Sequence, residues 1–475
     1  MANNSLDQTK GVKTLLGEPK KAVRKLAVPM IIAMLATTIY NLVDALWVSG
    51  FGKDIFTSAE VAEVGTGALA AVGFAMPFYM MIMSLSVGLG LGGGSAISRR
   101  IGAKDKKGAD NVAIHSIILS LLTAFIFSAI LMIFANAIFQ SIGAAETIHM
   151  ATSYGRIIFT GAIFIFFINV ALAILRAEGD AKRAMYAMVF GAVLNLILDP
   201  FFIFTFRLGV TGAAIATVLS MGVTAIILVY WLFFRKDTFV SFKFKDFKFK
   251  KDILKDIFRV GLPASVQQLS MSITMLVIII IIPIAGGGSN TVAVYNTGWR
   301  IVMIAVLPLL GMATAVTSVC GAAYGAKSYD KLNTAYMYAA KTGFFVEILC
   351  AILIFVLAPL IAIVFTTRPE DIIIRDDLRI FLQITCIFYP ASAFGIASSA
   401  MFQGTGKGIY ALIATLLRTI FLTILLALIS TFVLNAGVIG IWWSFVIANL
   451  VGSVISFGWG ILYVRRLILS DKSAV

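Results

Sequence analysis

Three carboxylate side chains lie inside long apolar stretches of this sequence, where an ionised group is unfavourable. Asp199 lies in the stretch NLILDPFFIF (195–204), directly before a proline, and Asp44 and Glu347 lie in two other apolar stretches. An ionised aspartate at the centre of a lipid bilayer costs about 2.5–3.5 kcal/mol even on the most lenient insertion scale. We therefore expect at least some of these acids to serve a function that requires them.

The spacing around Asp199 predicts a cluster of oxygen ligands. Asn195 lies four residues before Asp199, so both side chains lie on one face of a helix. With a rise of about 1.5 Å per residue, Asp44, Asp199 and Thr217 lie about 28, 24 and 27 Å from the inner ends of their helices. These similar depths predict that the four side chains meet in the outer half of the membrane. Their oxygens suit Na⁺, or the two carboxyl groups can share a proton; the residue types leave both ions open.

The composition identifies an integral membrane protein. Of the 475 residues, 60% are hydrophobic and 13% are charged, and the mean hydropathy is +0.98. Soluble domains carry roughly 25% charged residues. The three cysteines and two histidines have no spacing that predicts a disulfide framework or a metal cluster. We expect no enzymatic activity and no cofactor besides a coupling ion, which is H⁺ or Na⁺.

Twelve apolar runs have the length needed to cross the hydrocarbon core, which is about 20 residues. They cover 26–49, 67–93, 111–137, 151–175, 184–206, 211–234, 260–285, 297–320, 338–366, 379–402, 409–434 and 438–464. If the N-terminus is cytoplasmic, 7 of the 38 lysine and arginine residues lie outside and the remaining 31 lie inside. This asymmetry follows the positive-inside rule. We therefore predict an all-α, multi-pass protein of the cell membrane with both termini in the cytoplasm, whose net charge of +15 requires no nucleic-acid partner.

The chain is predicted to form two lobes of six transmembrane helices each. The segments are a cytoplasmic N-terminal segment (1–25), an N-terminal lobe (26–234), a cytoplasmic linker (235–259), a C-terminal lobe (260–464) and a cytoplasmic tail (465–475). The linker alternates lysine with phenylalanine, which is typical of an amphipathic segment at the lipid surface. An RNA-binding strand is the alternative interpretation of this alternation.

The two lobes share sequence motifs. SRRIGAKDKKGAD (98–110) follows the second run and CGAAYGAKSYDKLN (320–333) follows the eighth. AEGDAKRAMYAM (177–188) and FQGTGKGIYAL (402–412) lead into the fifth and eleventh runs. Because each repeat has an even number of spans, the lobes keep one orientation and are related by a pseudo-twofold axis along the membrane normal. Many transporters are built in this way.

The acids do not follow this repeat. Asp44 corresponds to about Ile278 in the second half, and Asp199 corresponds to about Thr423. Residues needed only to build a six-helix lobe should recur in both lobes. We infer that the two acids serve function and that ion coupling resides in the N-terminal lobe.

Together with NLILDPFFIF and LGVTGAAIAT (208–217), the repeated motifs resemble the multidrug and toxic compound extrusion (MATE) transporters from about residue 20 to 465. Acids in spans one and five are similar to the prokaryotic DinF-like branch. The NorM-like branch has a Glu in span seven and an Asp in span ten, and neither 260–285 nor 379–402 contains an acid. The resemblance implies that Asp44, Asn195, Asp199 and Thr217 form the cation site. Na⁺ is a possible metal ion bound there.

The resemblance also implies supporting residues. Tyr40, one turn before Asp44, and Tyr154 and Asn169, both in span four, match the polar network and substrate positions of the family. By the helical rise, Tyr154 and Asn169 lie about 22 Å apart, so they cannot both touch one ion. Proline frees backbone carbonyls and softens helices. Pro29 is accordingly expected to let span one bend, and Pro200 is a second hinge position.

A glycine-rich stretch invites a different interpretation. GLGLGG (88–93) formally fits the nucleotide-binding pattern G-x-G-x-x-G. It ends a membrane span instead of opening a helix after a strand. We predict that its small residues let neighbouring helices pack closely.

The sequence therefore predicts a secondary active multidrug efflux transporter that exchanges organic cations or amphiphilic compounds for H⁺ or Na⁺ by alternating access. Its partners are small amphiphilic or cationic substrates and membrane lipids, and one chain holds both lobes, so a monomer suffices. The alternative is a flippase for lipids or lipid-linked oligosaccharides within the same wider superfamily. Such a flippase should line its cavity with several cationic residues, whereas basic residues within the spans, such as Arg418, do not cluster.

Overall fold

The computed structural model describes residues 9–48, 51, 66–142, 147–235, 237–242, 247–366 and 369–473. Within these ranges the regular structure is helical, and no strand is present. The predicted terminal segments 1–25 and 465–475 and the linker 235–259 are described in part. Residues 1–8, Lys236, 243–246 and 474–475 of these segments lie outside the described residues.

Twelve helical runs of the described chain are long and apolar enough to cross a membrane. This confirms the predicted all-α membrane fold with twelve transmembrane helices. The runs of the first half are α2 (Pro19–Val48), α4 (Thr66–Gly102), α5 (Lys106–Ser141), α6 (Ile148–Ala177), α7 (Ala181–Pro200) continued by η2 (Phe201–Thr205), and α8 (Gly209–Val229) continued by η3 (Tyr230–Phe234). The short helix α1 (Lys10–Leu16) precedes them.

The second half begins with α9 (Lys251–Ile284) and ends with α17 (Gly437–Lys472). Its other elements are α10 (Ser289–Ala305), α11 (Leu307–Gly325), α12 (Tyr329–Phe365), η5 (Pro369–Ile374), α13 (Arg375–Thr385), η6 (Cys386–Phe388), α14 (Tyr389–Gly404), α15 (Gly408–Leu416), η7 (Leu417–Leu422) and α16 (Thr423–Phe432). η2, η3 and η7 are π-helical turns within or at the end of a span, and η5 and η6 are 3₁₀ turns.

The chain forms two compact units. Unit 1 comprises Met1–Lys13, Ile32–Ile101 and Asp105–Ser265, and unit 2 comprises Thr14–Ile31, Gly102–Lys104 and Val266–Val475. α2 and α9 therefore each contribute one end to either unit.

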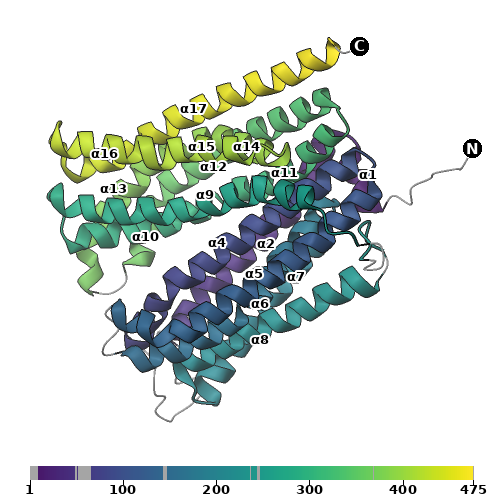
Figure 1. The fold of residues 1–475 in the computed structure, drawn as a ribbon. Helices are drawn as coiled ribbons and strands as arrows, with labels where there is room; N and C mark the ends of the chain where they lie inside the picture. Colours follow the sequence, from purple (N-terminus) through teal and green to yellow (C-terminus); the bar gives the residue numbers. More distant parts are fainter. Residues whose placement is uncertain are drawn as a thin grey trace, which may run out of the picture. The chain divides into compact units, whose positions relative to one another are not determined.

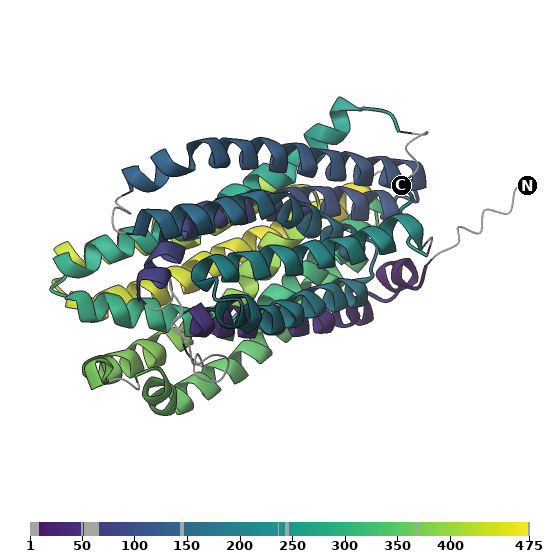
Figure 2. The same cartoon turned by 90° about the horizontal axis from the view of Figure 1, so that it is seen from below.

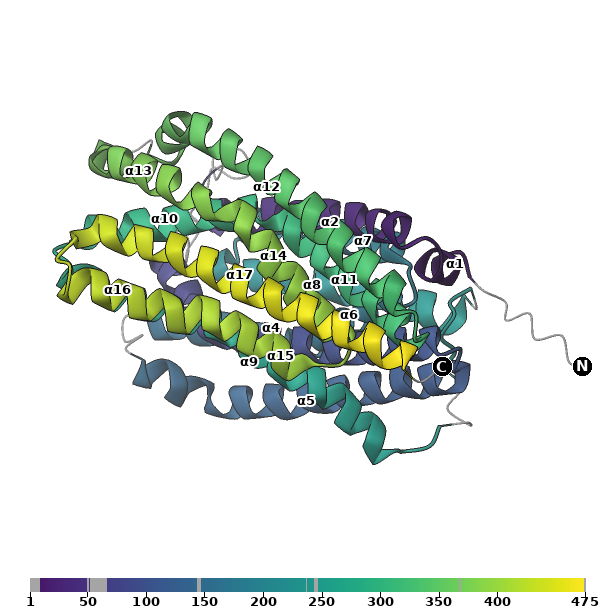
Figure 3. The same ribbon diagram turned by 90° about the horizontal axis from the view of Figure 1, so that it is seen from above.

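In unit 1, α6 packs against α5 and α8, and α8 packs against α7. These helices, purple-blue to teal in Figures 1 and 2, lie alongside one another. In unit 2, α14 packs against α11, α12 and α17. Figure 3 shows α14 between α12 and α17. Each unit therefore has one central helix that its neighbours surround.

The glycines of GLGLGG lie inside α4 and allow close approaches of other helices of unit 1. A Cβ atom on Gly88 would lie 2.6 Å from the carbonyl oxygen of Gly261 in α9, and one on Gly92 would overlap the carbonyl of Ile257. On Gly90 it would lie 3.0 Å from the carbonyl of Asn169 in α6. These contacts leave no room for a side chain, and they confirm the prediction of close helix packing.

Three segments differ from the predicted boundaries. The loop predicted at 98–110 is short, because α4 continues to Gly102 and α5 begins after Asp105, whose carboxylate accepts a hydrogen bond from the Gly108 amide at 2.8 Å. The apolar run 297–320 is divided at Val306, where α10 ends and α11 begins with Pro308 in its first turn. A proline suits the first turn of a helix, where its missing amide hydrogen would have no partner within the helix.

The linker is partly helical and partly bound to unit 1. Residues 251–259, predicted as linker, are the first turns of α9. Phe239 and Val240 are buried in unit 1, and the amide of Ser241 donates to Asp110 at 2.8 Å. Residues 239–241 therefore pack on protein, whereas Phe249 of the same linker is exposed. That the linker lies at the lipid surface stays a prediction.

Candidate functional site

The predicted cation-site residues come from three helices of unit 1. Asp44 lies near the end of α2, Asn195 and Asp199 lie in the second half of α7, and Thr217 lies in α8. α7 starts at a capped end, where the carboxylate of Asp180 accepts a hydrogen bond from the Arg183 amide at 3.1 Å. Such a cap satisfies an amide that has no partner within the helix. The start of α7 thereby fixes the register of its two site residues.

Asn195 connects α7 with α8. Its Nδ2 donates to Asp199 Oδ1 at 3.2 Å and to Thr217 Oγ1 at 3.4 Å. All three side chains are buried, and Asp199 is 0% exposed. The helical spacing brings Asn195 to Asp199, and the packing of α7 against α8 brings Thr217 to both.

Asp44 completes this group from α2. Its carboxyl group lies within electrostatic range of that of Asp199. Two carboxylates offer only hydrogen-bond acceptors, so a proton or a cation between them would relieve their repulsion. The structure therefore brings all four predicted residues together in one cluster, which we call the acid cluster: Asp44, Asn195, Asp199 and Thr217.

Three oxygens of the acid cluster have no hydrogen-bond partner among the described residues. They are Asp44 Oδ1, Asn195 Oδ1 and Asp199 Oδ2, and each is buried. Buried polar atoms in proteins are nearly always hydrogen-bonded, so such an exception requires an explanation. Carboxyl and amide oxygens are hard ligands of the kind that bind alkali cations. In the described part of the chain no group of three or more His, Cys, Asp or Glu side chains comes together.

Tyrosines surround the two acids. Tyr40 in α2 and Tyr154 in α6 both lie within electrostatic range of Asp44 and Asp199. Tyr79 in α4 lies within range of Asp44 and was not among the predicted residues. Its signal in the sequence is a hydroxyl in the otherwise apolar run AMPFYMMIM, two residues after Pro77.

Asn169 lies elsewhere in unit 1. Its Nδ2 donates to Ser86 Oγ in α4 at 3.1 Å and to the carbonyl of Ile165 at 3.0 Å. Tyr154, by contrast, packs against an apolar group that includes Val48, Phe204 and Ala213. The two residues of α6 therefore contact different surroundings.

The two predicted hinge prolines have different local structures. Pro29 lies inside α2, which continues unbroken from Pro19 to Val48, and the boundary between the two units falls two residues later, after Ile31. Pro200 is the last residue of α7, and the π-helical turn η2 follows it directly. Pro200 thus marks a change of helix type one residue after Asp199.

A buried acid outside the membrane spans was missed by the sequence reasoning. Glu178 lies between α6 and α7 and is 2% exposed; its Oε2 accepts hydrogen bonds from the amides of Phe239 at 2.7 Å and Val240 at 3.0 Å. Burial raises the pKa of Glu178 to about 8, although the two amides act against this shift. Arg183 also binds Asp237, at 2.6 Å. Residues 237–242, the docked linker segment, are therefore held on unit 1 by polar contacts.

Unit 2 contains the third membrane acid. Glu347 in α12 is 0% exposed, and neither carboxyl oxygen has a hydrogen-bond partner among the described residues. Tyr389 and Cys350 lie within electrostatic range of it. No second acid and no amide accompanies it in the contacts that the described chain makes, in contrast to the acid cluster.

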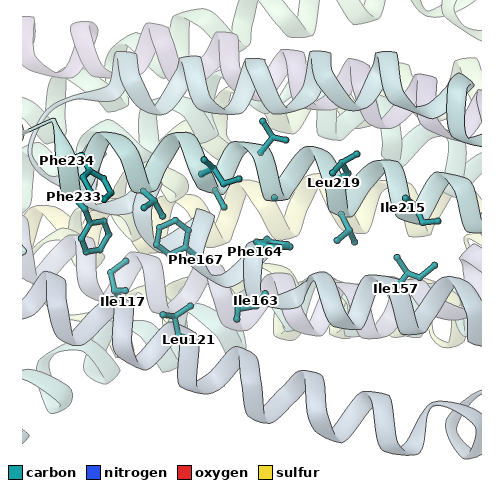
Figure 4. A pocket seen from close by; sticks show the side chains of 16 residues that line it. Ile117, Leu121, Ile157, Ile163, Phe164, Phe167, Ile215, Leu219, Phe233 and Phe234 are labelled. Carbon is teal, nitrogen blue, oxygen red and sulfur yellow. The ribbon is translucent and has the colours of Figure 1, made fainter.

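A cavity of about 1010 Å³ lies between α5, α6 and α8 of unit 1 (Figure 4). Its walls are apolar throughout, and Phe164, Phe167 and Leu219 are among the side chains that line it. None of the acid-cluster residues belongs to this lining. The cavity suits hydrocarbon chains, and it offers no charge to an ion or a head group.

Comparisons with known proteins agree with the motifs. A family model for MatE proteins matches residues 54–201 and 263–429. A multidrug export protein, MepA, from Staphylococcus haemolyticus is 26% identical over 458 residues, which cover 96% of this chain and 96% of that protein. A transporter of the MOP superfamily from Pyrococcus furiosus is 45% identical, with a TM-score of 0.92 over 97% of this chain and 99% of that one. An outward-facing structure of a multidrug resistance MATE transporter gives the same identity, coverage and TM-score.

Proposed function

Because the chain belongs to the MATE family, a family of membrane transporters, we propose that it exports organic cations and other amphiphilic compounds in exchange for H⁺ or Na⁺. The relatives described as multidrug export proteins support efflux as the direction of transport. The twelve membrane-spanning helices make it a multi-pass membrane protein. The cell membrane, with both termini in the cytoplasm, is the location that the distribution of basic residues favours.

The coupling ion is proposed to bind at the acid cluster. The observation that carries this proposal is the set of three buried oxygens, on Asp44, Asn195 and Asp199, that find no hydrogen-bond partner in the described part of the chain. One proton can bridge the two carboxyl groups, or one Na⁺ can be held by the carboxyl, amide and hydroxyl oxygens. Either ion would tie α2 to α7 and α8, and its release would leave two acids facing each other. This repulsion is the driving force that we assign to the rearrangement of α2.

The prolines and tyrosines have supporting roles in this proposal. Pro29 lets α2 bend when the occupancy of the acid cluster changes, because its ring removes one backbone hydrogen bond of the helix. Pro200 and η2 provide a second deformable point next to Asp199. Tyr40, Tyr79 and Tyr154 supply hydroxyl groups near the acids, and Asn169 belongs to the polar network further along α6.

The lipid or oligosaccharide flippase is the competing function. A flippase needs charged residues beside an apolar space, so that the head group and the chains are bound together. The large cavity of unit 1 has apolar walls and no such residue. This observation favours efflux of amphiphiles over flipping of a pyrophosphate-linked lipid.

Transport by the purified chain in proteoliposomes tests the proposal. Vesicles loaded with ethidium are given an inward-directed pH gradient, an inward-directed Na⁺ gradient, or neither. We expect dye efflux to accelerate under one of the two gradients and to collapse when an ionophore dissipates it. A rate of dye efflux that is the same with and without either gradient would rule out antiport. Lipid scrambling without dye efflux would favour the flippase.

A further inference from the structure

Arg418 lies in the middle of a membrane span of unit 2. It belongs to η7, within the span Gly408–Phe432, and lies ten residues after the start of that span, or about 15 Å along the helix. The side chain is 8% exposed. A bilayer core is about 30 Å thick, so this guanidinium sits near its centre. Charged residues at this depth usually serve function.

The guanidinium has no hydrogen-bond or ion-pair partner among the described residues. The backbone carbonyl of Arg418 accepts a hydrogen bond from the Thr423 hydroxyl at 2.9 Å, which leaves the guanidinium uncompensated. A buried acid can become neutral by taking up a proton, but arginine stays charged in proteins. Arg418 therefore needs a negative or strongly polar partner that this part of the chain does not supply.

Arg418 and Ser453 both pack closely against the backbone of glycines. A Cβ on Gly395 of α14 would lie 3.5 Å from Arg418 Nη1 and 2.8 Å from Ser453 Oγ of α17. A Cβ on Gly452 would lie 2.7 Å from the Cβ of Arg418. Ser453 Oγ is buried and also lacks a partner among the described residues. A charged donor and a free hydroxyl thus meet beside the bare backbone of Gly395.

The local helix geometry and the repeat both single out this position. η7 is a π-helical segment, and π-segments inside α-helices occur frequently at functional sites. Since Asp199 corresponds to about Thr423, Arg418 corresponds to about Leu194, an apolar residue of α7. The lobe scaffold therefore does not require an arginine here.

We propose that Arg418 and Ser453 form an anion-binding site in unit 2 that takes the acidic head group of an amphiphilic organic anion. The planar guanidinium binds a carboxylate, sulfonate or phosphate through paired hydrogen bonds. Head groups of bilayer lipids lie at the membrane surface, about 15 Å from the bilayer centre. A free inorganic anion loses its hydration at this depth and gains no burial of apolar surface in return. An organic acid with an apolar body can reach this depth, and the burial of its apolar surface offsets the dehydration of its acidic group.

Binding of radiolabelled cholate to the full chain in phosphatidylcholine nanodiscs tests this site. We expect saturable binding by the wild type, and weaker competition from the alcohol made by reducing the cholate carboxyl group. Arg418→Met should lower the affinity for cholate at least about tenfold. Arg418→Lys keeps the charge but loses the paired donors of the guanidinium, so its affinity should be intermediate. Ser453→Ala should weaken binding by a few-fold. Glu347→Gln, which neutralises a membrane acid of the same unit that belongs to neither site, should bind cholate like the wild type.

The competing ligands are distinguished in the same assay. Displacement of cholate by millimolar inorganic phosphate would replace the proposal with a free-anion site. Displacement by phosphatidylglycerol in the nanodisc would replace it with a lipid head-group site. Absence of saturable cholate binding, or equal affinity in a folded Arg418→Met variant, would overturn it.

Thermal unfolding separates a binding role from a structural one. Reaction of the buried cysteines Cys320 and Cys386 with a maleimide dye reports unfolding. If Arg418 serves to bind a ligand, its buried charge destabilises the protein when no ligand is bound. Arg418→Met should therefore unfold at the same temperature as the wild type, or at a higher one, in the absence of cholate. Cholate should raise the unfolding temperature of the wild type and leave Arg418→Met unchanged. A variant that is less stable, yet still gains the full cholate shift, would show that Arg418 is structural. If Arg418→Met does not fold, Arg418→Lys and Ser453→Ala decide the question.

Discussion

The interiors of the two units differ at corresponding positions although both units share one helical plan. In unit 1, Asn195 joins Asp199 to Thr217, and three oxygens of the acid cluster lack partners among the residues that the structure describes. In unit 2, the position corresponding to Asp44 is Ile278, which is 0% exposed, and Thr423 donates its hydroxyl proton to the Arg418 carbonyl. At these two positions the second unit shows what the scaffold needs, namely an apolar contact and a satisfied hydroxyl. At the same positions the first unit has acids, which we propose bind the coupling ion.

The same contrast appears at the loops that lead into spans five and eleven. AEGD (177–180) aligns with FQGT (402–405), so Glu178 corresponds to Gln403. Glu178 binds the docked linker segment, whereas Gln403 donates to Gln267 at 3.1 Å. Unit 1 thus has a titratable group where unit 2 has a neutral amide. Both comparisons agree with our proposal that ion coupling resides in unit 1.

The largest effect is expected when an acid of the acid cluster is neutralised. Asp44→Asn or Asp199→Asn should lower ion-driven dye efflux by about 5- to 150-fold, the range of typical coupling free energies. The double variant should be little worse than either single variant, because the two carboxyls act as one site. Proteoliposome efflux under an imposed gradient measures this effect.

The control for this prediction is Thr423→Val, at the position in unit 2 that corresponds to Asp199. It removes one satisfied hydroxyl and should leave efflux within about twofold of the wild type, at a stability cost of about 1 kcal/mol. Full coupled efflux in both single acid variants would move the coupling site away from the acid cluster. Equal losses in Thr423→Val would end the functional distinction between the units.

A smaller effect is expected for the neutral ligand of the acid cluster. Asn195→Ala removes the donor that holds Asp199 and Thr217, and it should raise the ion concentration for half-maximal efflux about tenfold, as expected for a hydrogen bond to a charged group. The maximal rate should change less than this concentration. Thr419→Val, the corresponding change in unit 2, should leave the ion dependence as it is. An unchanged ion dependence in Asn195→Ala would remove Asn195 from the site.

The acid cluster and the helices could be predicted from the sequence for simple physical reasons. Hydropathy gives the spans, and helical rise and i, i+4 spacing place Asn195 beside Asp199 at the depth of Asp44. Tyr79 and the break at Val306 could not be predicted, because they depend on how helices pack against each other. Glu178 resembles an ordinary loop acid in the sequence, and only the docked linker segment, 61 residues later at Phe239, buries it.

Glu178 predicts a pH dependence of the docked linker segment. Its pKa is raised in the docked state, so the docked state holds the proton more tightly than the undocked state. Docking is therefore most favourable at low pH, and this contribution is lost as the pH rises through about 8. Between pH 7 and pH 9 the linkage amounts to about 1.4 kcal/mol, or tenfold in the docking equilibrium. Hydrogen exchange should show protection factors of Phe239 and Val240 that fall about tenfold over this range.

Glu178→Gln gives unit 1 the amide that unit 2 has at this position. We expect protection of the Phe239 and Val240 amides in this variant to be independent of pH between 7 and 9. A parallel decline in the variant and the wild type would attribute the pH dependence to another group.

The smallest effect is expected for Glu347. Neither of its carboxyl oxygens has a hydrogen-bond partner among the described residues, and it lies in unit 2, which we propose does not couple ions. Unlike Arg418, a lone carboxyl group can become neutral by taking up a proton, so it needs no ligand to be tolerated. Glu347→Gln imitates that neutral form and should keep coupled efflux within about twofold and the unfolding free energy within about 1 kcal/mol. The acid cluster differs from Glu347 because it contains two neighbouring carboxyl groups and an amide. Replacing one of these carboxyl groups changes the number of protons that the cluster can exchange. Loss of coupling in Glu347→Gln would show that unit 2 contains a second coupling acid. The two units would then differ in the number of their ion ligands, and no longer in whether they couple ions.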